Sequence, residues 1–293
     1  VPELVVSGQG GLLDIILHPD FEQNQVLLLS YAHRNREGMT TRVARARLRG
    51  DHLSDVEVSF EALPRSNGGR HFAGRMEFDR EGNLYVAVGD RGDMDRAQDN
   101  ADDAGGVHRI TTDGSPAPGN PFLDTAGVND TFYTTGNRNI QGMTIHPETG
   151  EIWSHEHGPR GGDEINIIRA GTDYGWPTIT YGIDYSGLPI TSKTSEEGMA
   201  QPLHYWDPSI APSGMAFYTG DLFPEWQGDL FVGALKMRKL VRLRIQDGNV
   251  TEEEDLLTDL GERIRDVRTG PEGALWLLTD SPRGKVYRMV PVQ

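Results

Sequence analysis

The sequence contains no cysteine, no long hydrophobic run and no excess of basic residues. The absence of Cys excludes disulfides, thiolate catalysis and Cys-ligated zinc, although it does not identify the compartment. No window is apolar over a length sufficient to span a bilayer, so we expect no membrane span. The formal net charge of -16 argues against a nucleic-acid partner, whose phosphates require clustered Lys and Arg, and favours a soluble protein.

Turn-forming residues, by contrast, are abundant and evenly spread. The 293 residues include 36 Gly and 17 Pro in short bursts, which favours many turns over long helices. This length is compatible with about two domains, or with one all-β barrel or propeller. Because Val1-Pro2-Glu3 contains no visible secretory signal, we expect a mature form, a fragment or a cytosolic protein.

One pattern recurs along the chain: a short apolar strand, a turn built on Pro, Asp or Gly, and a second apolar strand. Five copies begin at Gly10, Gly74, Gly142, Gly214 and Arg265. After most copies comes a third, alternating strand, at residues 41–48, 106–111, 239–245 and 285–290. Repeats that cannot bury their own hydrophobic faces are typical of a β-propeller. The pattern therefore predicts an all-β, single domain over residues 1–293, with five antiparallel four-stranded blades.

The first residues predict how the propeller closes. Pro2 to Ser7, PELVVS, form a short apolar strand with no repeat of their own, whereas the last repeat offers three strands and ends at Met289-Val290. Pairing these two strands would complete the last blade and remove two exposed edges. We therefore expect the N-terminal strand to close the last blade.

The stretch from residue 135 to 177 concentrates polar groups around one turn. A predicted strand, Glu151 to His155, leads into the turn 157–162, and the acidic pair Asp163-Glu164 then opens a second apolar run. Main-chain carbonyls beside carboxylates supply the hard oxygen ligands that Ca²⁺ prefers. The alternative is an ordinary solvated loop, since Gly, Pro and Asp are common in any strand connection.

His71 and Asp90 are candidates for acid–base chemistry. His71 precedes one predicted strand of the second repeat, and Asp90 follows the neighbouring strand, so the two can lie close together. A carboxylate that holds an imidazole in one tautomer produces a general base. The alternative is a histidine with a structural role. We expect His155 and His157 to line the same mouth of the propeller rather than bind zinc.

Three basic residues lie at predicted strand ends. Lys236 follows a strand of the fourth repeat, and Arg263 and Arg265 enter the fifth repeat on one face. Such a cluster suits a small polyanionic ligand held by charge-assisted hydrogen bonds. The alternative is that the arginines form ordinary ion pairs with Glu262 and Asp266.

Several segments resemble one enzyme family, the soluble aldose sugar dehydrogenases of the glucose/sorbosone dehydrogenase family, which depend on pyrroloquinoline quinone (PQQ). The matching segments are GQGGLLDIILHPDF, GGRHFAGRMEF, YVAVGDRG, TGNRNIQGM, SHEHGPRGGDEIN, YGWP, APSGMAFY, GALKMRKLVRL and ERIRDVRTGPEGALWLLTD. They extend from Gln9 to Asp280 in the family's order. The resemblance therefore covers nearly the whole chain.

The resemblance implies oxidation of an aldose at C1. His71 matches the general base, Asp90 the carboxylate that supports it, and Arg138 and Asn139 the pair beside the quinone carbonyl. The implied reaction passes a hydride from the sugar C1 to C5 of PQQ and gives a lactone. Electrons then leave to an external acceptor.

Other matched positions are implied to bind the cofactor, calcium or the sugar. They are His71, Lys236, Arg263 and Arg265 for the cofactor; Gly158 and Pro159, through their carbonyls, for the calcium that touches it; Asp163, Glu164 and Tyr174 for a second, structural calcium; and Gln9 and Trp206 for the sugar. The family also implies a periplasmic or secreted location, and we expect a monomer.

The sequence also departs from the family. Its members usually have six blades, with one further blade before the GQGGLLD motif, whereas we expect five here because five repeats and a closing strand account for the chain. Arg70 and Phe72 stand where glucose-specialised relatives can have polar residues, which favours a broad aldose preference, and the lack of long inserted loops predicts an open site. Two other functions remain: a calcium-dependent hydrolase of sugar lactones, and a non-catalytic sugar-binding propeller.

Overall fold

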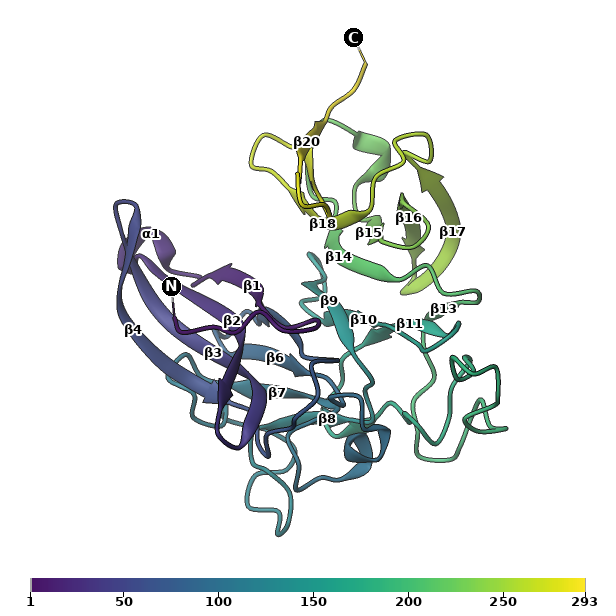
Figure 1. Ribbon diagram of the computed structural model, residues 1–293. Helices are drawn as coiled ribbons and strands as arrows, with labels where there is room; N and C mark the ends of the chain where they lie inside the picture. Colours follow the sequence, from purple (N-terminus) through teal and green to yellow (C-terminus); the bar gives the residue numbers. More distant parts are fainter. Residues whose placement is uncertain (1, 293) are drawn as a thin grey trace. The chain divides into compact units, whose positions relative to one another are not determined.

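The structure, a computed structural model, describes residues 2–292 and is an all-β protein. Its strands form five small, mostly antiparallel sheets of the kind that makes up the blades of a β-propeller (Figure 1). The chain divides into two compact units. Unit 1 comprises Val1–Ile140, Ile168–Thr180 and Thr191–Gln201, and unit 2 comprises Gln141–Ile167, Tyr181–Ile190 and Pro202–Gln293. The units are described separately below, and the expectation of a single domain stays a prediction.

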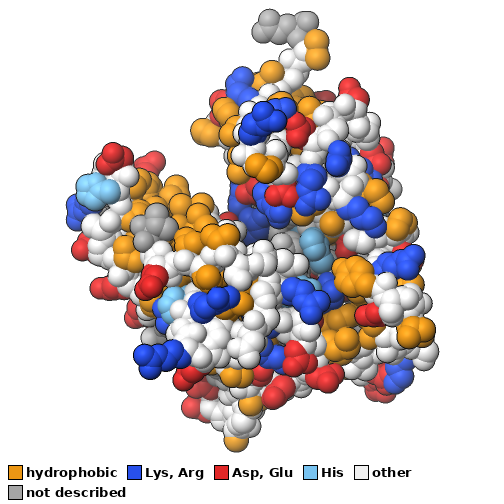
Figure 2. Space-filling model, viewed as in Figure 1, with side chains coloured by type: hydrophobic (Ala, Val, Ile, Leu, Met, Phe, Trp, Pro, Cys, Tyr) orange, Lys and Arg blue, Asp and Glu red, His pale blue; other side chains and the backbone are white. Residues whose placement is uncertain are grey.

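The first sheet of unit 1 is an antiparallel meander. Its strands, in order, are β1 (Leu12–Leu17), β2 (Val26–Asn35), β3 (Gly38–Arg49) and β4 (His52–Glu61), with the one-turn helix α1 (Phe21–Asn24) between β1 and β2. The apolar residues of β2 are buried, as expected for an inner strand. By contrast, β1 is an edge strand, and Leu12, Ile15 and Leu17 are about half exposed on it (Figure 2).

The second sheet of unit 1 carries the predicted base. Its order is β12-β8-β7-β6-β5, with β5 (Ala73–Phe78), β6 (Leu84–Val88), β7 (Gly106–Ile110), β8 (Phe132–Thr135) and the short parallel β12 (Thr172–Asp173). The 3₁₀ helix η1 (Met94–Gln98) follows β6. Leu84 and Val86 pack with Leu28 and Val43 of the first sheet, so one apolar core fixes both sheets of unit 1.

Unit 2 holds three sheets. The first has the order β13-β11-β10-β9, with β9 (Ile140–Ile145), β10 (Ile152–Glu156), β11 (Asp163–Ile167) and β13 (His204–Trp206). The second comprises β14 (Pro212–Phe217), β15 (Leu230–Ala234), β16 (Lys239–Gln246) and β17 (Asn249–Leu256), with the 3₁₀ helix η2 (Pro224–Trp226). The third comprises β18 (Ile264–Thr269), β19 (Leu275–Thr279) and β20 (Val286–Met289).

The repeats read from the sequence correspond to these sheets. Each of the five copies supplies the first two strands of one sheet, for example β14 and β15 from the copy that begins at Gly214. The predicted third strands are β3, β7, β16 and β20. The prediction of an all-β propeller with five blades is therefore confirmed.

The N-terminal residues contact the first sheet. The main-chain N–H of Val5 donates to the carbonyl of Ala32 at 2.8 Å, and the Val5 side chain packs against Ala32, Met39 and Phe72. Within residues 2–292 the sheet of β18, β19 and β20 has three strands, and its closure by the N-terminal strand stays a prediction. In the same described range, no helix is long and apolar enough to cross a membrane.

Candidate active site

His71 lies in the loop between β4 and β5, and its backbone is held in an uncommon conformation. Its φ is 48°, a left-handed value that costs a non-glycine residue free energy unless its surroundings fix it. The side-chain oxygen of Gln9 accepts a hydrogen bond from the His71 N–H at 2.7 Å. A Cβ on Gly89 would lie 2.3 Å from the His71 carbonyl oxygen, so glycine there permits the end of β6 to approach this loop.

Asp90 supports the imidazole of His71 directly. The Nδ1 atom of His71 lies 2.6 Å from Asp90 Oδ1, and Asp90 is 1% exposed. The same oxygen accepts the Gly92 N–H at 2.7 Å. Burial alone would raise the pKa of Asp90, but the hydrogen bond and charge of His71 and the Gly92 N–H hold it below its usual value. An ionised carboxylate only accepts hydrogen bonds, so Nδ1 carries the proton and Nε2 is left as the basic nitrogen.

Trp176, which we had not assigned a role from the sequence, completes this group. Its indole N–H donates to Asp90 Oδ2 at 2.9 Å, and the guanidinium carbon of Arg138 lies 5.2 Å from its ring centroid. Asn139 accepts the Ala73 N–H at 3.2 Å through its side-chain oxygen. The structure therefore joins the predicted His71, Asp90 and Arg138 through one buried tryptophan, and it places Asn139 at the start of β5 beside His71. The signal in the sequence was the YGWP segment itself.

Arg91 is a second residue that the sequence analysis missed. Its guanidinium donates to the carbonyl oxygens of Arg70 and, at 2.8 Å, of Gly68, and it stacks 3.4 Å from the centroid of the Phe72 ring. Burial lowers the pKa of Arg91 to about 9. Phe72 is 2% exposed, so it belongs to the core beneath the loop and is not placed for the sugar contact considered above. Arg91 and Phe72 together fix the loop that presents His71.

The predicted basic cluster lies in unit 2 and has an unexpected partner. Arg263 donates through Nε to Asp280 Oδ2 at 2.7 Å, and Arg265 lies 3.1 Å from Oδ1 of the same carboxylate. Burial opposes ionisation of Asp280, but these two arginines hold its pKa below the usual value. Lys236 is exposed and follows β15. Two arginines therefore share one carboxylate, and with the exposed Lys236 the cluster keeps a surplus of positive charge.

The two acidic residues proposed as partners for these arginines are paired elsewhere. Glu262 accepts a hydrogen bond from Lys285 at 2.6 Å, and Asp266 pairs with Arg268 at 3.3 Å. Neither residue forms an ion pair with Arg263 or Arg265 in the described part of the chain. The simple ion-pair interpretation of the cluster is therefore wrong in its partners.

Asp163, a predicted calcium ligand, is instead saturated by hydrogen bonds from the protein. It is fully buried, and its Oδ1 accepts the Gly158 N–H at 3.0 Å. Its Oδ2 accepts the hydroxyl of Ser209 at 2.7 Å and the N–H groups of Ile210 and Ala211 at 2.8 and 3.0 Å. Asp163 thus ties the turn that contains Gly158 and Pro159 to the loop before β14.

Glu164 faces a like charge. It lies directly opposite Glu156 in the pairing of β10 with β11. Burial and then the charge of Glu156 raise the pKa of Glu164 above its usual value. Two carboxylates placed in this way are a chemically suitable place for a cation. Tyr174 belongs to unit 1, where its hydroxyl accepts the Arg169 N–H at 3.1 Å.

No group of three or more His, Asp or Glu side chains suited to a metal ion occurs among the described residues. The predicted ligands Gly158 and Pro159 would act through main-chain carbonyls, which such a group does not include. The Nε2 atoms of His155 and His157 form hydrogen bonds with the carbonyls of Ser213 and Pro212. These histidines therefore connect β10 and its following turn to β14, and His155 is fully buried rather than lining an open mouth.

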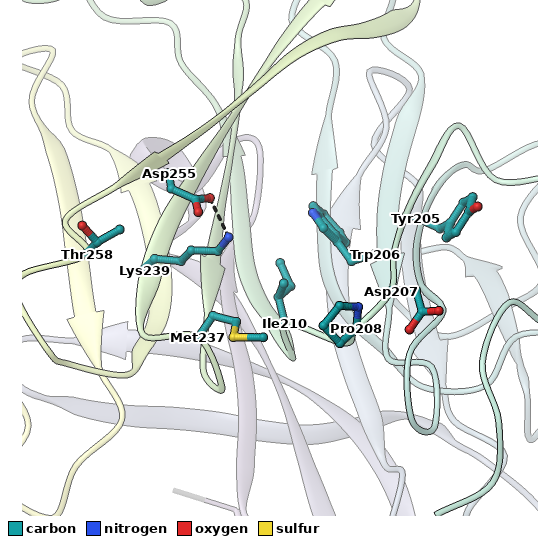
Figure 3. A pocket seen from close by; sticks show the side chains of 9 residues that line it. All are labelled: Tyr205, Trp206, Asp207, Pro208, Ile210, Met237, Lys239, Asp255 and Thr258. Carbon is teal, nitrogen blue, oxygen red and sulfur yellow. Dashed lines mark hydrogen bonds and ion pairs between the residues drawn. The ribbon is translucent and has the colours of Figure 1, made fainter. Parts of the chain in front are cut away.

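Trp206 lines a separate pocket in unit 2 (Figure 3). Trp206 is 6% exposed, and its indole N–H is shared between the two carboxylate oxygens of Glu253, each at 3.1 Å. The pocket volume is about 450 Å³, and Met237 and the ion pair of Lys239 with Asp255, at 2.5 Å, form the opposite wall. Only part of the Trp206 ring is thus open to a ligand.

The fold and the buried histidine–carboxylate pair define a β-propeller enzyme. The chain belongs to the glucose/sorbosone dehydrogenase family, whose model matches residues 1–288. It is 43% identical over 296 residues to the aldose sugar dehydrogenase YliI of Escherichia coli, covering 99% of this chain and 80% of the relative.

Solved structures agree with this assignment. One glucose dehydrogenase structure superposes with a TM-score of 0.96 at 42% identity, covering 100% of this chain and 85% of that one. The PQQ-bound form of an aldose sugar dehydrogenase from Streptomyces coelicolor superposes with a TM-score of 0.80 at 28% identity, covering 99% of this chain and 81% of that one.

Proposed function

We propose that this protein oxidises aldose sugars at C1 to the lactone, using PQQ and calcium, and passes the electrons to an external acceptor. The observation that carries the proposal is the 2.6 Å contact between His71 Nδ1 and the buried, ionised Asp90. It belongs to a chain 43% identical to an aldose sugar dehydrogenase. A base of this kind is what removal of a hydroxyl proton requires.

The role of each residue around His71 follows from its contacts. Nε2 of His71 removes the proton of the C1 hydroxyl, since Nδ1 is already committed to Asp90. The imidazolium that forms is stabilised by the carboxylate of Asp90, which stays ionised. Arg138 supplies positive charge that favours the negative charge developing on an acceptor oxygen. Asn139 keeps the strand after His71 in place through Ala73.

The basic cluster of unit 2 fits a polycarboxylate cofactor. Arg263 and Arg265 share Asp280 as their one counter-charge among the described residues, and Lys236 is exposed, so the three cations can bind further carboxylates. PQQ, when bound, would supply the two-electron acceptor that the oxidation of the sugar at C1 requires. A lactone hydrolase has no use for this surplus of cations, which is why we favour the dehydrogenase.

Calcium fits the turn in unit 2 through oxygen ligands. The carbonyls of Gly158 and Pro159 would hold the ion, which would act as a Lewis acid. Asp163 fixes this turn through the Gly158 N–H rather than by binding the metal. Glu164, whose charge is unfavourable beside Glu156, remains the proposed ligand of a second calcium. Tyr174 is a proposed contributor on the basis of family resemblance alone.

The remaining assignments are broader. We propose a range of aldoses as substrates, with contacts at Gln9 and Trp206, a periplasmic or secreted location, and a monomer. Gln9 also has a structural task, because its side-chain oxygen holds the His71 N–H.

The test is dye-linked oxidation of glucose and other aldoses by the purified apo-protein. We expect activity only when PQQ and Ca²⁺ are both added. Activity on sugar lactones without PQQ would replace the proposal with the hydrolase. Sugar binding without turnover, together with no PQQ binding in an absorbance titration, would replace it with the binding propeller.

A further inference from the structure

Trp176 links the two charged groups beside His71. Its indole N–H donates to Asp90 Oδ2 at 2.9 Å, and the Arg138 guanidinium lies over its ring at 5.2 Å. The backbone of Trp176 is fixed as well, because its N–H donates to the Gly136 carbonyl at 2.9 Å and its carbonyl accepts the Gln98 side chain at 2.9 Å. Trp176 is 6% exposed, so its ring is held rigidly between these groups.

We propose that Trp176 is a positioning residue that sets the basicity of His71 through Asp90 and holds the guanidinium of Arg138 over its ring. This inference rests on the proposed function, since it explains how the general base of that reaction is tuned. Trp176 itself contacts neither the reacting atoms nor the basic nitrogen of His71.

The effect on His71 follows from how the charge of Asp90 is shared. Oδ1 receives the His71 Nδ1–H and the Gly92 N–H, and Trp176 is the donor to Oδ2 among the described residues. Removing the indole N–H leaves a buried oxygen without a donor and directs more of the negative charge toward His71. The imidazolium form of His71 is then favoured relative to the wild-type protein.

The other charged groups near Asp90 are cationic. They are Arg138, which lowers the pKa of Asp90, and Arg91, whose pKa the charge of Asp90 raises. Neither donates a hydrogen bond to Oδ2 in the described part of the chain. Both arginines remain in a variant that alters only the indole. A change in the titration of the His71 side chain would therefore report the loss of one neutral hydrogen-bond donor.

The ring face and the N–H group can be separated by substitution. Trp176→Phe keeps an aromatic face for Arg138 and removes the donor, whereas Trp176→Leu removes both. A matched control is Trp276→Phe, because Trp276 donates its indole N–H to Glu272 at 2.9 Å on β19. The control makes the same chemical change at an exposed site in unit 2.

The experiment is an NMR pH titration of the histidine side chains of ¹⁵N-labelled protein, with the His71 signals identified from His71→Ala. We expect the pKa of His71 to rise by roughly 0.5 to 1 unit in Trp176→Phe, the scale of one neutral hydrogen bond. Trp276→Phe should leave it unchanged. An unchanged His71 titration in a Trp176→Phe protein that melts cooperatively would overturn the inference.

A second measurement uses only the wild-type protein, so it does not depend on whether a variant folds. In the wild-type protein the Trp176 indole N–H signal should shift with the titration of His71, because Asp90 joins the two groups. A Trp176 signal that stays constant across that titration would also overturn the inference.

Activity assays test the positioning role of Trp176 separately from the proposed oxidation of aldoses. With PQQ and Ca²⁺ added, the acid limb of the kcat/KM profile should move to higher pH in Trp176→Phe by the same amount as the His71 titration. In Trp176→Leu, kcat should fall further while the KM for the sugar changes little. If the NMR shift occurs but the wild-type protein oxidises no aldose, the proposed function fails and the positioning role of Trp176 stands.

Discussion

Two carboxylates, Asp90 of unit 1 and Glu164 of unit 2, have opposite surroundings. In unit 1, Asp90 is surrounded by the imidazole of His71, the Gly92 N–H and the Trp176 indole, and its pKa lies below the usual value. In unit 2, Glu164 stands directly opposite Glu156, and its pKa lies above the usual value. The ionised form of the first carboxylate is stabilised by its neighbours in the protein, whereas that of the second is disfavoured by burial and by the charge of Glu156.

The basic residues follow the same contrast. Arg91 in unit 1 is fully used by the carbonyls of its own loop and the Phe72 ring. In unit 2, Arg263 and Arg265 share Asp280, and Lys236 is exposed, so this cluster retains positive charge. The contrast agrees with the proposal that unit 1 supplies the general base and that the basic cluster of unit 2 binds an anionic cofactor.

The strongest test of the site in unit 1 is His71→Ala. Loss of the base should reduce turnover by roughly 10² to 10⁴ while PQQ remains bound, as measured by dye-linked aldose oxidation and absorbance titration. His18→Ala, which removes a histidine from the turn after β1, serves as the control. Full activity of His71→Ala would show that His71 is not the general base of the reaction.

The next largest effect concerns Asp163, which connects the turn at Gly158 to the loop before β14 in unit 2. Asp163→Ala removes the carboxylate that accepts hydrogen bonds from the Ser209 hydroxyl and from the N–H groups of Gly158 and Ile210, so the free energy of unfolding should fall by about 3 kcal/mol. Urea unfolding measures this loss. Asp259→Ala, at an exposed position, should change the midpoint little. An equal, small effect for both variants would contradict the bracing role.

The surplus of positive charge in unit 2 predicts a specific loss of cofactor affinity. Arg263→Ala should weaken PQQ binding roughly tenfold to a hundredfold, the scale of one charge-assisted hydrogen bond. Arg244→Ala removes an arginine paired with Glu252 on the same unit and should leave the affinity unchanged. Equal affinities of both variants would show that the cluster does not bind the cofactor.

The smallest effect is the pH dependence of stability that arises from Asp90. Because its pKa is lower in the folded protein than the ordinary 3.8, ionised Asp90 stabilises the fold above that value, and this stability is lost as the pH falls through the folded pKa. The melting temperature of wild type should therefore exceed that of Asp90→Asn at neutral pH and converge with it in acid. A constant difference across the pH range would indicate that Asp90 is not ionised in the folded protein.

Local pattern explains which parts of this site could be predicted. His71 and Asp90 flank adjacent strands of one repeat, so their pairing follows from the geometry of a hairpin. Trp176 is 86 residues from Asp90 in the chain, and no periodicity connects them. The actual partner of Arg263 and Arg265 is likewise Asp280, at the end of β19, and not an acidic neighbour in sequence. A long-range contact depends on how loops from different strands converge, which sequence spacing does not specify.

The sequence by itself determined the all-β class, the five repeated sheets and the pairing of His71 with Asp90, because alternating apolar residues and turn residues act over short distances. Only the tertiary structure decided that Val5 contacts the first sheet, that Asp163 is a brace and that Trp176 joins Asp90 to Arg138. Each of these depends on which buried donor or acceptor lies nearest once the chain has folded. That choice is made by packing across the whole unit, and not by neighbouring residues in the chain.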